Sequence, residues 1–295
     1  MTKNKHIHII LPILIAFCLF SCENELDLEI PDHESKLVVE GWIETNSTAK
    51  VLLSLSAPYF TKIDSSNLRD YSVTTAKVSL RNKSTGEVLT LKPNEVFFPP
   101  YYYFGTEIVG LENENYELEI NYKEKTYISS TSIPKMVPLD SAWFMLNSNS
   151  DTSGQVFIRI IDAPNENNFF RVFTKQKGKD QHYKATFTST FSDELFTNDT
   201  ITLALLNGSN NALEVEQNRY YHSNDTIIVK FCTINEEHFT YWKDIQTHII
   251  NSANPLSVTH SDISSNIENG YGYWGGYAVW YDTIYPNKNP SWIAP

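Results

Sequence analysis

"YELEINYKEKTYISS", residues 116–130, indicates the fold class of this chain. Tyr116, Leu118, Ile120 and Tyr122 alternate with polar residues, and the strand pattern resumes after a polar turn. Because side chains alternate between the two faces of a strand, this stretch predicts a β-hairpin with one buried face.

Similar patterns precede this hairpin along the chain. "AKVSLRNKSTGEVLTLKP" (76–93) predicts another hairpin, and "KLVVEGWIE" (36–44) and "AKVLLSLSAPY" (49–59) each predict a strand. Short strands at this spacing are typical of a β-sandwich. We therefore expect residues 36–135 to form an immunoglobulin-like (Ig-like) or carboxypeptidase-regulatory-like β-sandwich.

The C-terminal half also predicts β-structure. Apolar residues alternate in "GQVFIRIIDAP" (154–164), and later stretches of strand composition are separated by Asn and Gly clusters. Two prolines in "SIPKMVPLD" (132–140) mark the expected boundary, so residues 136–295 are expected to form a second β-sheet domain. The 16 Phe, 17 Tyr and 6 Trp residues favour a mostly-β fold, because aromatic side chains pack well on a pleated surface.

One segment predicts a helix instead. Thr233 and Glu236 have the spacing of a capping box, and the amphipathic helix is expected near residues 235–250. Its apolar residues recur at steps of three, three and four, so we expect this stripe to pack on the second sheet. The stripe consists of Phe239, Trp242, Ile245 and Ile249.

The last distinctive stretch is "NIENGYGYWGGYAVWYD" (266–282), which holds four of the 11 glycines. Glycine permits positive φ, bulges and close backbone approach. We interpret this stretch as a bulged strand that returns to the sheet.

The first 22 residues have the features of a secretory leader. They contain two lysines and no acidic residue, and the apolar run over residues 7–20 is shorter than the roughly 20 residues that a membrane-spanning helix needs. The run leads into Ser21 and Cys22, an ending that resembles a bacterial lipobox, although Phe20 replaces the usual small residue. Residues 1–21 are therefore expected to be a lipoprotein signal peptide that is cut between Ser21 and Cys22.

Cys22 suits lipidation, because its thiol can form a thioether to diacylglycerol and its new amino group can take a further acyl chain such as palmitate. Each buried methylene contributes about 0.8 kcal/mol, so two or three chains hold a protein on a bilayer. The alternative is an ordinary secreted protein in which Cys22 is incidental.

Residues 22–35 are expected to be an acidic tether. They contain Glu23, Glu25, Asp27 and Glu29 close behind Cys22, which resembles the surface-export signal of Bacteroidota lipoproteins. The alternative is a plain solvated tether that anionic headgroups repel.

Charge and cysteine content restrict the partners and the chemistry. Without the two lysines of residues 1–21, the chain keeps 21 basic and 35 acidic residues, a formal charge of −14. A nucleic-acid partner is not expected, because such binding needs a basic surface. Cys232 is the only cysteine of the sequence after Cys22, so no intrachain disulfide is expected. Strand alternation predicts a half-buried structural thiol at Cys232, opposite Val229 and Phe231.

Taken in order, these motifs resemble an uncharacterised family of Bacteroidota outer-membrane lipoproteins, of the domain-of-unknown-function 4249 type. The resemblance rests on "SCENELDLEIP" before "KLVVEGWI", on "VLLSLSAPYF", on "VPLDSAW", on the helix "EEHFTYWKDIQ" and on the ending "SNIENGYGYWGGYAV". Trp274 stands where the family usually has Phe. The family is similar to accessory lipoproteins of TonB-dependent transporters, and its first domain resembles Ig-like sandwiches attached to such transporters. The resemblance implies no catalytic residue.

The sequence contains no recognisable catalytic or metal-binding motif. Gly-x-Ser-x-Gly, His-Glu-x-x-His, Walker-type and dinucleotide-binding patterns are all missing from it. No histidine after the leader has metal-ligand spacing with another ligand type, and His238 and His248 are expected on an exposed polar helix face. We therefore expect no enzyme activity, no metal and no cofactor, although an acid–base pair assembled from distant carboxylates stays open.

Two aromatic groups are candidate contacts for a ligand or partner. Tyr101, Tyr102 and Tyr103 follow a proline-containing loop, and Tyr273 and Trp274 lie in the glycine-rich stretch. Aromatic faces suit sugar stacking or the apolar surface of a partner. For both groups the alternative is packing inside the core.

Four positions match the pattern Asp-Ser/Thr-apolar, which resembles the acceptor of periplasmic O-glycosylation in Bacteroidota. The same pattern is also a common strand entry, so both interpretations stay open. The candidate acceptors are Ser141, Thr200, Thr226 and Thr283.

These features together lead to one functional expectation. We expect an outer-membrane lipoprotein, lipid-anchored and facing the cell exterior, that serves a TonB-dependent nutrient transporter as a non-enzymatic accessory or ligand-capture subunit. The alternative is a stand-alone lipoprotein that binds glycans or surfaces. A glycan or a peptide is the expected ligand.

Overall fold

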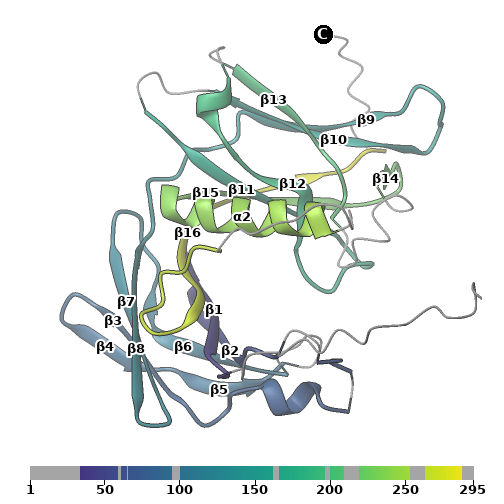
Figure 1. Ribbon diagram of the computed structural model, residues 1–295. Coiled ribbons are helices and arrows are strands. Elements are labelled where there is room, and N and C mark those ends of the chain that lie inside the picture. Colours follow the sequence, from purple (N-terminus) through teal and green to yellow (C-terminus); the bar gives the residue numbers. More distant parts are fainter. Residues whose placement is uncertain are drawn as a thin grey trace, which may run out of the picture. The chain divides into compact units, whose positions relative to one another are not determined.

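The structure is a computed structural model, and its described residues form a mostly-β fold with several sheets and one α-helix, as expected (Figure 1). The described residues from Ser35 onward belong to one compact unit. The predicted signal peptide (1–21) and nearly all of the predicted tether (22–35) lie outside the described residues. The structure describes residues 34–58, 61–64, 66–94, 100–161, 166–196, 200–208, 219–252 and 263–287.

The N-terminal half contains the predicted β-sandwich. Its strands are β1 (Leu37–Glu44), β2 (Thr48–Leu55), β3 (Lys77–Asn82), β4 (Thr85–Val88), β5 (Thr90–Pro93), β6 (Tyr101–Val109), β7 (Asn115–Tyr122) and β8 (Lys125–Ser132). Strands β1, β2, β6 and β5 lie next to one another in one sheet, and β4, β3, β7 and β8 form the other. A short 3₁₀ helix, η1 (Leu68–Tyr71), precedes β3.

The two predicted hairpins form, with one refinement. Strands β7 and β8 pair as expected, and Tyr116, Leu118 and Ile120 are buried on one face. In the earlier hairpin β4 pairs with β3, but the chain then changes sheet and β5 pairs with β6. The predicted second strand of that hairpin is therefore split between the two layers of the sandwich.

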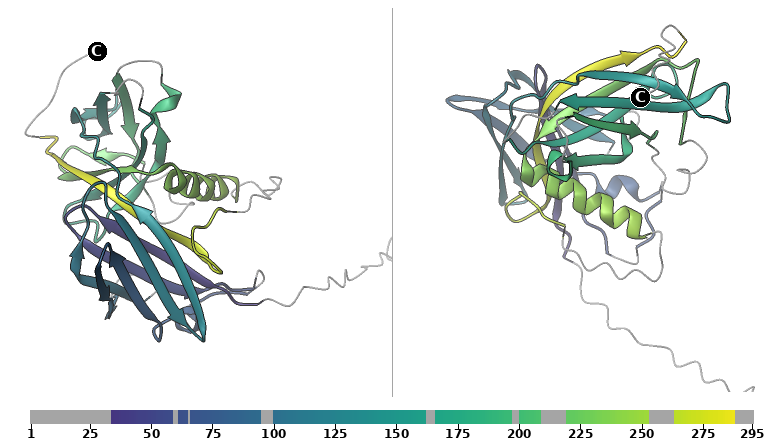
Figure 2. Two further views of the ribbon diagram at one scale, coloured as in Figure 1. Left: turned by 90° about the vertical axis from the view of Figure 1, so that its left-hand side faces the viewer. Right: turned by 90° about the horizontal axis from the view of Figure 1, so that it is seen from above.

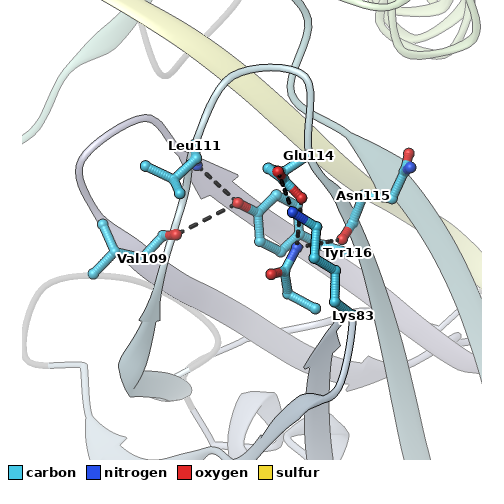
Figure 3. Close-up of polar contacts among 7 residues, drawn as sticks. Lys83, Val109, Leu111, Glu114, Asn115 and Tyr116 are labelled. Atoms are coloured by element: carbon cyan, nitrogen blue, oxygen red, sulfur yellow. Dashed lines mark hydrogen bonds and ion pairs between the residues drawn. The ribbon is translucent and has the colours of Figure 1, made fainter.

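A tyrosine fixes the corner between β6 and β7 (Figure 3). The hydroxyl of Tyr116 accepts a hydrogen bond from the Leu111 amide at 2.7 Å and donates one to the Val109 carbonyl at 3.4 Å. A tyrosine that bonds back to the backbone a few residues upstream is a hallmark of Ig-like sandwiches. Beside it, Lys83 pairs with Glu114 at 2.6 Å.

The C-terminal half is divided between two sheets. Its strands are β9 (Ser141–Leu146), β10 (Ser153–Ile161), β11 (Phe169–Gln176), β12 (Lys184–Ser192), β13 (Thr200–Leu205), β14 (Tyr221–His222), β15 (Ile227–Ile234) and β16 (Tyr271–Ile284), with a 3₁₀ helix, η2 (Asp193–Leu195), after β12. Strands β9, β10, β13 and β14 form a separate four-stranded sheet. Strands β11, β12 and β15 belong to a larger sheet, which also contains the last strand, β16.

Strand β16 belongs to both halves of the chain. Residues 271–277 pair in parallel with β1, and residues 278–284 pair antiparallel with β15. One eight-stranded sheet, in the order β12-β11-β15-β16-β1-β2-β6-β5, therefore runs through both halves (Figure 2). The predicted division into residues 36–135 and 136–295 stays a prediction, and the structure adds that the two parts share this strand.

The glycine-rich stretch forms β16, as interpreted from the sequence. Gly272 adopts φ +102°, and a Cβ there would lie 1.9 Å from the Val39 carbonyl oxygen, so only glycine fits. Trp274 follows and is fully buried in the sandwich core, where its Nε1 donates to the Tyr116 carbonyl at 3.2 Å.

Both faces of β15 are covered. Val229 and Phe231 lie in the core shared with β10 and β11, and Cys232 lies in a smaller cluster on the opposite face. The opposite placement of Cys232 agrees with the prediction, but the thiol is fully buried rather than half-buried. Burial raises its pKa to about 12.

The predicted helix is α2 (Glu236–Ser252), and it packs against β11, β12 and β16 (Figure 1). The predicted capping box does not form. Thr233 is still part of β15, and its hydroxyl accepts a hydrogen bond from the Val137 amide at 3.0 Å. Asn235 precedes the helix, and its side chain donates to the Ser132 carbonyl at 2.8 Å.

The buried side of α2 differs from the predicted stripe. Ile249 is 52 % exposed, whereas His238 and Tyr241 are buried. The prediction of an exposed His238 is therefore wrong. The helix presents polar and aromatic side chains to the sheet, because the sheet face below it is itself polar and aromatic.

Candidate functional site

The sheet face below α2 is set by the register of β1 and β16. Trp42 is paired with Gly275 in parallel alignment, so both residues lie on the same face. The imidazole of His238 lies directly on Gly275, since a Cβ at that position would be 2.2 Å from ring atom Cε1. The face that α2 covers therefore also carries the alternate residues Glu40 and Glu44 of β1.

His238 is the centre of the part of this face that α2 covers. Its Nε2 accepts a hydrogen bond from Trp242 Nε1 at 2.9 Å, and its ring stacks on Tyr273 at 4.6 Å. Its Nδ1 is buried without a hydrogen-bond partner among the described residues. Burial, reinforced by the nearby charge of Arg171, holds the pKa of His238 well below its usual range. This imidazole is consequently neutral at pH 7.

Arg171 is a buried cation next to this histidine. Its Nη1 donates to the Tyr277 hydroxyl at 2.7 Å, and its guanidinium carbon lies 3.3 Å from the centroid of the Trp242 ring. Its Nε is buried without a hydrogen-bond partner in the described part of the chain. The ring face and the hydroxyl therefore stabilise the charge that burial would otherwise disfavour.

Glu40 is the carboxylate that acts on Arg171 through space. Its side chain is exposed, yet surrounding protein atoms desolvate it and raise its pKa, while Arg171 acts in the opposite direction. Among the described residues, no ion pair or hydrogen bond joins the Glu40 carboxylate to Arg171.

A second buried cation lies at the margin of α2. Lys230 Nζ contacts Glu44 Oε1 at 2.5 Å, with side-chain exposures of 10 % and 14 %. Three rings surround the ammonium, at 5.3 Å for Phe173, 5.6 Å for Tyr183 and 5.8 Å for Tyr277. Burial raises the pKa of Tyr281 on the rim of this group, and the charge of Glu44 acts in the same direction.

Beyond this pair the sheet face continues, and no helix among the described residues packs on it. Lys50 is paired with Trp42 on one side and with Phe104 on the other, so the three side chains lie in a row. Lys92 lies over the Phe104 ring at 3.7 Å, and Lys175 lies 5.7 Å from the Tyr183 ring. We call this surface the open strip, and it consists of Trp42, Lys50, Lys92, Phe104, Lys175, Tyr183 and Tyr281.

Comparison with known proteins places the chain in a family. A family model described as "Domain of unknown function (DUF4249)" matches residues 23–280. The chain belongs to this family. A search of the curated proteins found no match.

Solved structures of other proteins also match this DUF4249 chain. One that matches is described as "Anomalous substructure of Titin-A168169", with 11% sequence identity over 70% of this chain and 91% of that chain. Its TM-score is 0.19.

The aromatic residues singled out in the sequence separate into core and surface. Tyr103, Tyr273 and Trp274 are buried, at 3 %, 6 % and 0 % exposure, so the alternative of core packing applies to them. Tyr101 is 37 % exposed. Tyr102 is half-buried, pairs with Lys92 and lies 6.2 Å from Phe104, which places it beside the open strip.

The four candidate glycosylation positions lie at strand ends. Ser141 and Thr200 begin β9 and β13, Thr226 directly precedes β15, and Thr283 lies near the end of β16. Thr200 and Thr283 are exposed, whereas Ser141 and Thr226 are half-buried. Glycosylation at these positions stays a prediction.

The remaining questions raised by the sequence concern the lipidation site, metal binding and membrane-spanning helices. Ser21 and Cys22 lie outside the described residues. Among the described residues, no group of three His, Cys, Asp or Glu side chains is placed to hold a metal ion. None of the helices in this part of the chain combines the length and apolarity needed to cross a bilayer.

A surface hollow of about 220 Å³ lies elsewhere, on the sheet of β3, β4 and β7. One of its walls is Glu87, whose carboxylate accepts the backbone amides of Thr106, Glu107 and Ile108 at 2.8–3.0 Å. Because these bonds occupy the buried carboxylate, Glu87 acts as a structural support for β6.

Sequence reasoning missed most of the residues on the sheet face that carries α2 and the open strip. Arg171, Lys230 and His238 come from segments that were interpreted only as strand or helix. A usable signal was present, since aromatic and charged residues alternate at i and i+2 in Trp42/Glu44 and Phe173/Lys175. Such alternation places both kinds of side chain on one face of a strand.

Proposed function

We propose that this DUF4249 protein is an outer-membrane lipoprotein that faces the cell exterior and captures a ligand for a TonB-dependent transporter, without catalysing a reaction. The anchor would be Cys22, for which the lipobox-like ending of the leader argues. The acidic residues that follow support export to the surface.

The observation that favours ligand capture is the open strip. Lysines and aromatic rings alternate there across several strands of one sheet, a combination that offers both ion pairing and ring stacking to a partner. The rigid sheet holds these groups in place, which reduces the entropy lost on binding.

Co-purification from native membranes tests the transporter part of the proposal. The natural lipoprotein, tagged at its C-terminus, is extracted with mild detergent, and its partners are identified by mass spectrometry. We expect a TonB-dependent transporter among the partners, and we expect the Cys22→Ala variant to leave the membrane fraction. Repeated recovery without any transporter would remove the accessory role.

The alternative is a stand-alone lipoprotein that binds a glycan or surface. The half-buried Tyr102 and the 51 % exposed Tyr281 favour it, because such rings can stack on sugars. Glycan arrays with Tyr102→Ala and Tyr281→Ala separate the two functions when combined with the co-purification. Trp274→Ala is unsuitable, because this side chain fills the core.

A further inference from the structure

The charge of the open strip is opposite to that of the chain. The whole sequence has a formal net charge of −12, yet the exposed Lys50 and Lys92 and the half-buried Lys175 project from one sheet face. None of the three has a carboxylate within ion-pair distance among the described residues. A positive strip on an acidic protein favours an anionic partner.

The carboxylates on the same face do not cancel this charge. Glu44 is bonded to Lys230 at 2.5 Å, so its charge is matched by a buried cation. Glu40 is exposed on the same face, so one unmatched carboxylate stands against three lysines, of which Lys175 also donates to the Gln181 carbonyl at 2.9 Å. His182 adds no charge at pH 7, because burial, Lys175 and Lys50 lower its pKa.

The aromatic rings next to the lysines favour a sugar ligand over a ligand that offers only phosphate groups. Phe104 lies under Lys92, Tyr183 lies beside Lys175, and Trp42 and Phe104 flank Lys50. A pyranose offers an apolar face to such rings, while its acidic substituent can reach the neighbouring ammonium. We infer that the open strip binds an acidic glycan, a deepening that rests on the proposed ligand capture at this face.

The extent of the strip fits an oligosaccharide. Lys92 on β5 and Lys175 on β11 are separated by six interstrand steps of about 4.8 Å. The register also places Lys175 at the level of Thr283, whereas Lys50 lies at the level of Gly275, so the lysines are spread along the strands as well as across them. This spread exceeds a single sugar and fits an oligosaccharide.

Helix α2 argues against a flat lipid surface as the partner. It packs on β11, β12 and β16 on the same face as the strip, and a helix is about 10 Å across. It therefore rises above the strands beside the lysines and would hinder a planar bilayer from reaching them. A linear polymer can lie alongside the helix.

The test measures binding of the full lipoprotein in detergent micelles to oligogalacturonate by isothermal titration calorimetry. The triple variant Lys50→Gln/Lys92→Gln/Lys175→Gln removes the strip charges, and Lys62→Gln/Lys77→Gln/Lys135→Gln removes three exposed charges elsewhere. We expect the first variant to bind about tenfold more weakly and the second to bind like the natural protein. Equal weakening in both variants overturns the inference.

Further binding measurements distinguish the classes of ligand, and they also distinguish this inference from the proposed function. Single-stranded DNA and phosphatidylglycerol vesicles carry anionic charge without an acidic pyranose, and either one binding as tightly as oligogalacturonate overturns the inference. Absence of oligogalacturonate binding also overturns it, while recovery of a transporter in the co-purification would leave the proposed function intact. Glycan binding without a transporter would preserve the inference and remove the accessory role.

Discussion

The Glu44 carboxylate and the Lys230 ammonium meet at 2.5 Å although 186 residues separate them in the sequence. One comes from β1 and the other from β15, and β16 lies between these strands in the sheet. The ion pair therefore connects the N-terminal sandwich to the C-terminal half at a largely buried position.

Removing one partner of this pair is expected to destabilise the fold. Lys230→Ala should lower the free energy of unfolding by about 3 kcal/mol, because Glu44 is left buried without its cation. The double variant Glu44→Leu/Lys230→Met should recover most of the loss. Urea unfolding measures both, and Arg81→Ala, at an exposed ion pair, serves as the control with a change within about 0.5 kcal/mol. A double variant as unstable as the single one would contradict the coupling.

His238 is expected to make the stability depend on pH. The folded protein keeps this imidazole neutral, whereas the unfolded chain binds a proton below its ordinary pKa of about 6.5. The free energy of unfolding should therefore fall as pH drops below 6.5, by about 1.4 kcal/mol per pH unit from this group. Urea titrations at pH 7.5, 6.5 and 5.5 measure the slope, which His238→Gln should reduce. An unchanged slope in that variant would rule out His238 as the source.

Gly275 is expected to tolerate no side chain. A Cβ there would lie 2.2–2.7 Å from three atoms of the His238 ring, which stacking on Tyr273 holds in place. Gly275→Ala should therefore cost about 2 kcal/mol in thermal or urea unfolding. The matched control is Gly86→Ala, where the nearest atom is 3.7 Å away and little change is expected. Equal stability of the two variants would mean that α2 does not hold this ring against β16.

The Tyr116 hydroxyl is expected to stabilise the sandwich corner. Tyr116→Phe leaves the Leu111 amide and the Val109 carbonyl without this partner and should cost about 1–2 kcal/mol. Tyr122→Phe, on the same strand, is the control, since its hydroxyl makes no hydrogen bond to any of the described residues. Hydrogen exchange of the Leu111 amide should also accelerate in the first variant alone.

Local patterns predicted the elements well because each depends on neighbours in sequence. Alternation identified the buried face of β7, and the apolar spacing identified α2. The pairing of β16 with both β1 and β15 could not be predicted, because strand partners distant in sequence leave no local pattern. The same limit explains why Trp274 was considered for the surface, since its burial depends on β1 and β7 rather than on β16 itself.

The open strip was missed for a related reason. Its lysines and aromatic rings come from strands β1, β2, β5, β6, β11 and β16 and from Tyr183, which directly precedes β12. No single stretch of sequence therefore displays the open strip. His238 was misplaced because a helix stripe was defined by apolar residues alone. In the structure its partners are Trp242 one turn away and Tyr273 on the sheet, a polar–aromatic contact that hydrophobic spacing does not detect.

The position of β16 also bears on how the polypeptide matures. The sandwich begins at residue 37, but the strand that completes its larger sheet on one side is 271–277, close to the C-terminal end. Because synthesis proceeds from the N-terminus, more than 200 residues must follow the start of β1 before β16 can pair with it. Until then β1 and β15 each expose an unpaired edge, the kind of surface that holding chaperones protect.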